Sequence, residues 1–253
     1  MLKIEVQIVI TLKSNNMRKT NIGWCTHSWN PFNGCTRYSL GCKNCYAFRD
    51  YTFHKKSWAK KYPNGMEQVA VHPEMLNEPY KLKAPAMIFV GSTGDIFHKD
   101  MPIDFLQQLF KVMNDNQLLV FQLLTKRAEQ MVEIAPSLTF TENIWMGVTI
   151  EHNDYCYRAD LLRQMPAKVK FISAEPLLSK LSGLDITGID WLIAQGESGF
   201  NARPVELDWF THLRDLAHNN NIPFYFKKWG GTGVNKKSEL LEGVIYKQFP
   251  SVN

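Results

Sequence analysis

The sequence is poor in the features that would place a protein in a membrane or outside the cell. Its 253 residues include no run of eighteen apolar residues, so no transmembrane helix is expected. The opening stretch, MLKIEVQIVITLK, has only a short apolar patch and lacks a small-residue cleavage site, which makes it a poor signal peptide. No low-complexity linker divides the chain. The sequence therefore predicts a single cytoplasmic domain with no membrane association.

Cysteines are also few, and the odd number of five argues against a secreted disulfide scaffold. Three of them, Cys35, Cys42 and Cys45, lie close together in CTRYSLGCKNCY with the spacing C-x6-C-x2-C, whereas Cys25 and Cys156 are interpreted as buried thiols. Thiolates are soft ligands that suit zinc, copper(I) or iron–sulfur clusters. A structural zinc site usually has four ligands in two close pairs, and an electron-transfer cluster has four cysteines. Three cysteines would leave one iron of a four-iron cluster open to a small molecule.

The cysteine loop, with the aromatic Tyr46 directly after its last cysteine, resembles the cluster loop of the radical S-adenosylmethionine (SAM) superfamily. Its first gap is longer than that of C-x3-C-x2-C, the commonest superfamily pattern. The wider text, from about Thr20 to Gly231, is similar to a phage-associated family of three-cysteine-motif proteins. The segments that carry this similarity are TNIGWCTHSWNPFNGCTRYSLGCKNCYA, GSTGDIFHKDMP, LLTKRAEQ, AQGESGFNARP and FYFKKWGG.

This resemblance implies a [4Fe-4S] cluster held by Cys35, Cys42 and Cys45, with SAM bound at the open iron. Reductive cleavage of SAM would yield a 5′-deoxyadenosyl radical that abstracts a hydrogen atom from the substrate. A flavodoxin-like or ferredoxin-like protein is expected to deliver the electron. The resemblance names no substrate, and the sequence predicts neither a catalytic residue nor an oligomeric state.

The predicted secondary structure follows a repeated alternation. Apolar runs of five to seven residues alternate with helical patterns, as in βαβ units that build a parallel sheet. The expected strands span residues 24–29, 86–91, 118–124, 144–150, 169–174, 191–195 and 223–227. The expected helices span residues 46–61, 104–114, 126–135, 154–164 and 208–219. Right-handed crossovers would curl this α/β fold into a parallel (β/α) barrel or partial barrel of six to seven βα units, which the resemblance implies is radical-SAM-like. Residues 1–19 are expected to be a loosely ordered N-terminal extension, and residues 20–253 the barrel domain.

Polar residues follow nearly every expected strand, and in such barrels the chemistry lies at the carboxyl ends of the strands. The candidate cofactor-binding residues at these ends are Ser92, Gly94, Asp95, Glu151, Ser173, Gln195 and Glu197. The resemblance implies that Asp95, in GSTGD, receives the ammonium group of SAM, that Glu151 or Ser173 binds the ribose, and that QGES lines the adenine side. Ser92 and Asp95 could instead cap the following helix. Glu175 and Glu197 could instead contact the substrate.

The formal net charge of +5 permits a phosphate-bearing partner without demanding one. The sequence has no zinc-finger pairing, no RNA-binding aromatic signature and no long run of lysine or arginine. The leading hypothesis is a radical SAM enzyme that acts on a nucleotide or nucleic-acid-derived substrate. The alternative is a non-catalytic, zinc-binding module associated with nucleic acid, in which His27, His54 or Asp50 completes the three cysteines. An ordinary hydrolase finds no support, because the chain lacks a nucleophile elbow and a metal-binding helix motif.

Overall fold

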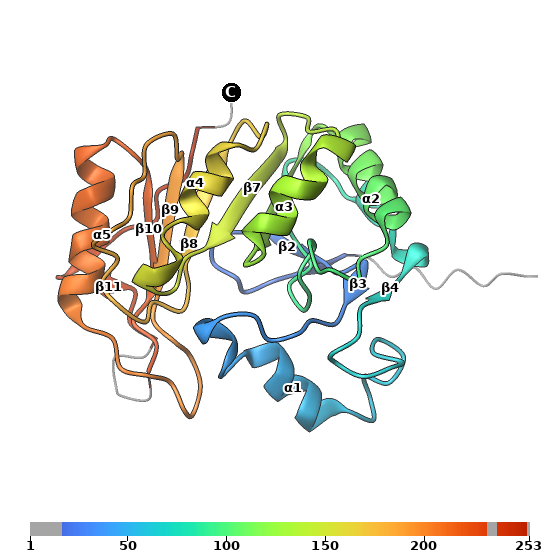
Figure 1. Ribbon diagram of the computed structural model, residues 1–253, viewed down its shortest axis with the longest axis horizontal. Coiled ribbons are helices and arrows are strands. Elements are labelled where there is room, and N and C mark those ends of the chain that lie inside the picture. The colour runs from blue at the N-terminus through green and yellow to red at the C-terminus, as the bar shows by residue number, and fades with distance from the viewer. Residues whose placement is uncertain (1–16, 232–236, 252–253) are drawn as a thin grey trace, which may run out of the picture.

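The main sheet curls into a half-barrel of seven parallel strands, with an eighth, antiparallel strand at one edge (Figure 1). The computed structural model describes residues 17–231 and 237–251. The strand order is β1-β2-β5-β6-β7-β8-β9-β10. The bounds are β1 (Arg18–Lys19), β2 (His27–Trp29), β5 (Ala86–Val90), β6 (Leu119–Thr125), β7 (Ile144–Thr149), β8 (Lys170–Ala174), β9 (Trp191–Gln195) and β10 (Phe224–Lys228). Each parallel strand overlaps one of the seven expected from the sequence, so the predicted partial barrel is confirmed.

Helices cover one face of this sheet and one of its ends. Figure 1 shows α2 to α5 along the outer face, whereas α1 lies below the arrowheads of the strands. The α-helices are α1 (Tyr46–His54), α2 (Ile103–Asp115), α3 (Ala128–Ile134), α4 (Arg158–Arg163) and α5 (Leu207–Asn219). Short 3-10 helices span Leu40–Cys42, Pro73–Met75, Pro79–Lys81, Ala135–Ser137 and Asn153–Tyr155. Two small sheets pair β3 (Phe32–Asn33) with β4 (Ala70–Val71) and β11 (Leu240–Leu241) with β12 (Val244–Ile245).

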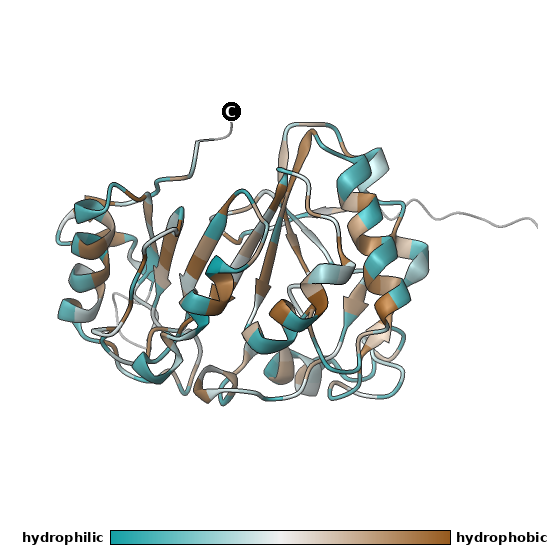
Figure 2. Cartoon of the chain, turned by 45° about the horizontal axis from the view of Figure 1, so that its top comes forward, coloured by the Kyte–Doolittle hydropathy of each residue, from teal (hydrophilic) through white to brown (hydrophobic). Residues whose placement is uncertain are grey.

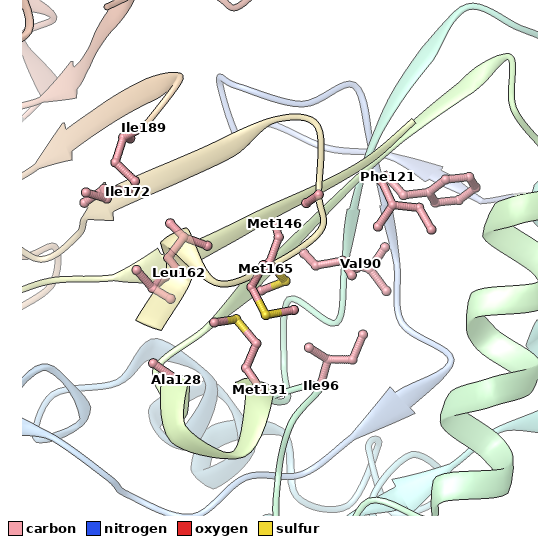
Figure 3. Close-up of a cluster of buried hydrophobic side chains, with 14 of the residues drawn as sticks. Val90, Ile96, Phe121, Ala128, Met131, Met146, Leu162, Met165, Ile172 and Ile189 are labelled. Atoms are coloured by element: carbon pink, nitrogen blue, oxygen red, sulfur yellow. The ribbon is translucent and has the colours of Figure 1, made fainter. Parts of the chain in front are cut away.

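Both faces of the sheet are apolar, and the alternation of side chains along each strand divides them into two cores. One alternate set of strand residues, such as Met146, faces the helices, where Figure 3 shows Met146 beside Met131 and Met165. The other set, such as Trp145, faces the interior of the half-barrel, in a second cluster rich in aromatic residues. In Figure 2 the strands are accordingly brown over most of their length, whereas the helices carry teal on one side. This burial on both faces explains why the strands appear in the sequence as continuous apolar runs.

The helix expected over residues 46–61 is shorter than predicted, because α1 ends at His54. The His54 carbonyl still accepts from the Trp58 amide at 2.9 Å, and the Ser57 hydroxyl donates to the same carbonyl at 3.0 Å. Four lysines follow in residues 55–61, and like charges spaced four apart disfavour a helix. The helix expected over residues 154–164 begins as a 3-10 turn, and its α-helical part is α4.

Of the predicted N-terminal extension, residues 1–16 lie outside the described residues. Two of the three that follow belong to the sheet: Arg18 pairs with Ser28 and Lys19 with His27 in the antiparallel β1–β2 pair. Within the described ranges, no helix combines the length and the hydrophobicity needed to cross a bilayer.

Candidate active site

A pocket of about 470 Å³ lies at the carboxyl ends of the parallel strands. The residues that line it come from the cysteine loop and from the ends of strands far apart in the sequence. They include Cys35, Cys42, Cys45, Ser92, Gly94, Asp95, Lys126, Thr149, Ser173, Glu175, Gln195, Glu197, Lys227 and Lys228. Three of them follow from strand alternation, because Thr149, Ser173 and Gln195 are the last inward-facing positions of β7, β8 and β9.

The three cysteines of the loop share this pocket, whereas Cys25 and Cys156 are not among its lining residues. Cys42 lies in a 3-10 turn and Cys45 directly precedes α1. Burial, together with the nearby Asp95 carboxylate, raises the pKa of the Cys35 thiol to about 12. Among residues 17–231 and 237–251, no three Cys, His, Asp or Glu side chains have the geometry of a site for one metal ion. That the three sulfur atoms converge on a cluster stays a prediction.

Glu151 lies beneath the cysteine loop and is not one of the residues that line the pocket. One carboxylate oxygen accepts hydrogen bonds from the Ser39 hydroxyl and from the Gly41 amide, the latter at 3.1 Å. The other oxygen pairs with the Arg158 guanidinium at 3.0 Å, and both side chains are fully buried. Burial alone would raise the pKa of Glu151, but Lys126 and Arg158 outweigh it and lower the pKa. Glu151 therefore anchors the cysteine loop to the end of β7 and to Arg158.

Glu197 anchors the same loop from the other side. Its carboxylate accepts from the Asn44 amide at 3.0 Å and from the backbone amide of Arg203 at 2.9 Å. The Arg203 guanidinium forms a two-oxygen pair with Glu197 and also donates to the Leu40 carbonyl at 3.0 Å. Although burial raises the pKa of Glu197, the hydrogen bonds from Arg203 lower it overall. Glu197 does line the pocket, but its oxygens are already engaged by the protein.

A third contact fixes the start of the loop. The Arg127 guanidinium donates to the Thr36 carbonyl at 3.2 Å and to the Thr36 hydroxyl at 2.7 Å. The Nε2 atom of His98 lies 2.9 Å from the same hydroxyl. Arg127 also stacks over the ring of Tyr38, 4.6 Å from its centroid. Residues that follow β5, β6, β7 and β9 thus hold the segment between Cys35 and Cys45 at several points.

Asp95 has a structural role that the sequence left open. Its Oδ1 atom accepts from the Phe97 amide at 3.1 Å and from the Thr125 hydroxyl at 2.6 Å, and its Oδ2 atom accepts from the Lys126 amide at 3.1 Å. The Arg127 guanidinium lies 3.9 Å away. Asp95 therefore ties the loop after β5 to the end of β6. Contact with SAM stays a prediction for this residue.

The other two candidate residues of the GSTGD segment, Ser92 and Gly94, also contact the protein itself. The Ser92 hydroxyl donates to the side chain of Asn30 at 2.9 Å. A Cβ atom on Gly94 would lie 2.8 Å from the ring of Phe32, so packing against this ring requires glycine at position 94. The Phe32 ring therefore occupies the space that a side chain at position 94 would need.

Three buried oxygens on the opposite wall are different, because they have no hydrogen-bond partner among the described residues. They are Ser173 Oγ, Glu175 Oε1 and Gln195 Oε1, and all three residues line the pocket. Buried polar atoms in native proteins nearly always have a partner, so unpaired ones in a pocket mark a place for ligand donors. Ser173 and Gln195 were predicted as binding residues, and Glu175 was considered as a substrate contact.

The residues considered as a fourth zinc ligand lie elsewhere. His54 stacks on an indole ring, with ring centroids 5.4 Å apart. Asp50 pairs with Arg49 at 3.1 Å, and the His27 ring is hydrogen-bonded to the Thr26 hydroxyl. None of the three is among the residues that line the pocket of the cysteines.

Sequence reasoning missed the arginines that complete these anchors: Arg127, Arg158 and Arg203. Arginine is usually exposed, and its burial here depends on acids and carbonyls that the fold brings to it. One usable signal was present, since Arg158 and Arg203 each follow an acid at a strand exit by six or seven residues.

Solved structures of spore photoproduct lyase have a similar fold. A tyrosine-to-phenylalanine mutant of that enzyme is 11% identical to this chain, with 86% of this chain and 80% of the lyase covered at a TM-score of 0.50. The lyase complexed with dinucleoside spore photoproduct is 12% identical, with 73% and 59% covered and a TM-score of 0.46. A cysteine-to-alanine mutant with the same ligand is 12% identical, with 72% and 59% covered and a TM-score of 0.48. At this identity the likeness shows the fold alone, and the chain covers only 59% of the length of the last two lyase chains.

No curated protein is significantly similar to this sequence. The profile of one family, described as "Protein of unknown function (DUF5131)", matches residues 19–250. That match covers the whole half-barrel, the cysteine loop and every residue of the pocket. It does not test the expected relation to phage-associated proteins, which stays a prediction. Because the profile spans nearly the entire chain, the protein belongs to the DUF5131 family.

Proposed function

We propose that this protein is a radical SAM enzyme that acts on a substrate derived from nucleic acid. The observation that carries the proposal is the position of the three loop cysteines. Cys35, Cys42 and Cys45 line the same pocket as the carboxyl ends of a parallel half-barrel. The spore photoproduct lyase that shares this fold at a TM-score of 0.50 is a radical SAM enzyme, which supports the same assignment.

The residues present fit a cofactor of this kind. Cys35, Cys42 and Cys45 would hold a [4Fe-4S] cluster through three of its irons, and SAM would bind at the fourth. Unpaired buried oxygens of Ser173 and Gln195 on the far wall suit the hydroxyl and amino donors of a nucleoside. When bound, the cluster and SAM supply a 5′-deoxyadenosyl radical. The electron for that chemistry would come from a flavodoxin-like or ferredoxin-like partner.

The task of the chain itself is to bind and to orient. Glu151 and Glu197 fix the cysteine loop against the strand ends, so the three thiols are presented to one space. The aromatic cluster inside the half-barrel, which includes Trp24 and Phe89, lies directly beneath the pocket, and both residues line its floor. An apolar floor keeps bulk water away from a reactive intermediate.

The direct test is to purify the protein anaerobically from iron-replete cells. We expect a brown protein that contains iron and sulfide, whose visible absorption is bleached by dithionite. Incubation of the reduced protein with SAM is expected to release 5′-deoxyadenosine. A colourless protein with one zinc ion per chain under the same conditions would refute the proposal and support the zinc-binding module instead.

A further inference from the structure

The last parallel strand, β10, ends in two consecutive lysines that both line the pocket, Lys227 and Lys228. In a regular strand, neighbouring side chains point to opposite faces. Here the pairing of β10 with β9 shifts register between Phe226 and Lys228, because Phe226 pairs with Ala194 and Lys228 with Gln195. One extra residue in a strand re-aims the side chains that follow it. The irregularity thus brings two ammonium groups to one wall of the pocket.

The protein neutralises only one of these two lysines. Lys227 lies 3.6 Å from Glu175, whose other oxygen is buried and unpaired. Lys228 has neither a carboxylate within salt-bridge distance nor a hydrogen-bond partner for its ammonium group in the described part of the chain. Burial and the neighbouring charge of Lys227 lower the pKa of Lys228 overall, although the carboxylates of Glu175 and Glu239 partly oppose them. The wall carries a net positive charge that an anionic ligand would balance.

A second pocket, of about 610 Å³, adjoins the first and shares Asn44, Cys45 and Arg49 among its lining residues. It adds two more cations, Lys43 and Arg37, of which Arg37 lies 3.7 Å from the Glu67 carboxylate. A single carboxylate, such as that of SAM, would need only one of these cationic sites. A row of cations that continues from one pocket into the next matches a ligand with repeated negative charges.

The second pocket also offers an aromatic platform. Phe200, at its rim, is 92% exposed, and Phe48 lines the same space with the Arg37 guanidinium 4.1 Å from its ring centroid. The Arg49 guanidinium lies against the backbone of Gly199, beside Phe200. A cationic groove with exposed aromatic side chains is the usual arrangement for binding single-stranded nucleic acid, because bases stack on the rings while phosphates contact the cations.

We propose that Lys227 and Lys228 bind a phosphodiester of single-stranded nucleic acid, and that the strand continues through the second pocket against Phe200. This inference rests on the proposed function for its choice of substrate class, and it narrows that class. A free base or nucleoside would leave Lys228 without a counter-charge. The phosphate would accept from both ammonium groups, while donors of the attached nucleoside reach Glu175 Oε1 and Gln195 Oε1.

The test is fluorescence anisotropy with the full chain, anaerobically purified, and three labelled probes: decathymidylate, decauridylate and a decathymidylate with a neutral methylphosphonate backbone. We expect the two charged probes to bind at least about ten times more tightly than the neutral probe. Comparing the first two probes separates DNA from RNA as the source of the phosphodiester. Equal binding of charged and neutral probes, or no binding of either charged probe at low salt, would overturn the inference.

Substitution of single lysines tests which residue contacts the phosphate. Lys228→Gln should weaken binding of the charged probe by about ten-fold, the loss expected for one charge-assisted hydrogen bond. It should also reduce the slope of log K against log salt by about 0.7, since one phosphate contact is lost on a single strand. The matched control is Lys83→Gln, an exposed lysine that precedes β5 at the other end of the sheet and removes the same charge. An unchanged salt slope in Lys228→Gln contradicts the inference even if the affinity falls.

The outcome is independent of the proposed chemistry, because iron content and SAM cleavage are measured on the same preparations. A protein that cleaves SAM but binds the charged and neutral probes equally would retain the proposed function and lose this inference. A protein without iron that shows the predicted probe preference and slope change would retain the inference and lose the proposed function.

Discussion

The carboxylate of Glu151 accepts a hydrogen bond from the backbone amide of Gly41, a residue 110 positions earlier in the chain, at 3.1 Å. Gly41 directly precedes Cys42, so this bond sets the height of the cysteine loop above the end of β7. A Cβ atom at position 41 would come within 3.0 Å of the same carboxylate oxygen. Glycine therefore permits the approach, and the acid fixes it.

Replacing Glu151 with glutamine should destabilise the fold. The buried Arg158 would lose its counter-charge, and breaking one partner of a buried pair costs about 3–5 kcal/mol. For a chain of this size that corresponds to a Tm lower by roughly 6 °C or more. Iron content after anaerobic reconstitution should fall as well, because the single amide oxygen of glutamine cannot accept from both Arg158 and the loop donors.

The matched control is Glu142→Gln, which removes a surface acid paired with Lys168 at 2.6 Å. Surface pairs contribute little, so its Tm should stay within about 2 °C of the wild type. A wild-type Tm and iron content in Glu151→Gln would show that this carboxylate does not anchor the loop.

Asp95→Asn separates a structural role from a role in ligand binding. An amide offers one acceptor oxygen in place of two, so the Lys126 amide or the pair formed by Phe97 and Thr125 loses its partner. A buried donor without a partner costs about 1–3 kcal/mol, so we expect the Tm to fall. A thermal melt and a SAM titration on the reconstituted variant distinguish the two roles. An unchanged Tm with weakened SAM binding would assign Asp95 to the ammonium group of SAM instead.

The seven parallel strands could be predicted because their signal is local. Each is a run of apolar residues buried on both faces, so its pattern depends little on which strands lie beside it. Lengths of helices were less predictable. The end of α1 at His54 coincides with a cluster of lysines in residues 55–61, whose mutual repulsion disfavours a longer helix.

The pocket was predictable in position but only partly in its residues. Ser173 and Gln195 face the pocket because strand alternation aims them there, and the sequence carries that alternation. Glu151 lies beyond the end of β7, so the alternation of side chains along a strand does not predict its direction. Its carboxylate accepts a hydrogen bond from the cysteine loop. Whether an acid at a strand exit binds a ligand or the protein depends on side chains from other segments, such as Arg158 and Arg203.

The next prediction concerns which cysteines bind the cluster. Cys42→Ala should abolish iron loading and the release of 5′-deoxyadenosine, because Cys42 lines the pocket and a cluster cannot replace a lost thiolate. Cys156→Ala should change neither quantity, since Cys156 lies beside α4 and outside the lining residues. Iron, sulfide and 5′-deoxyadenosine are measured side by side on both variants. Equal iron loading in the two variants would remove Cys42 from the ligand set.

His98 should make the stability of the protein depend on pH. Its Nδ1 atom accepts from the Asp100 amide at 3.2 Å, which leaves Nε2 as the donor to the Thr36 hydroxyl at 2.9 Å, so the ring is held neutral. Burial and the nearby Arg127 lower the pKa of His98 below its usual 6.5, although Asp100 and Asp95 partly oppose them.

The sign of the effect follows from proton uptake. Below about pH 6.5 the unfolded chain protonates this histidine while the folded protein does not, so stability falls as the pH drops from 6.5 toward the folded pKa. His98→Gln cannot titrate, so its Tm should decline less between pH 7.5 and pH 5.5 than that of the wild type. Thermal melts at both pH values give the comparison, and the other histidines cancel because both proteins carry them. Parallel declines in the two proteins would mean that His98 is protonated as readily in the folded protein as in the unfolded chain.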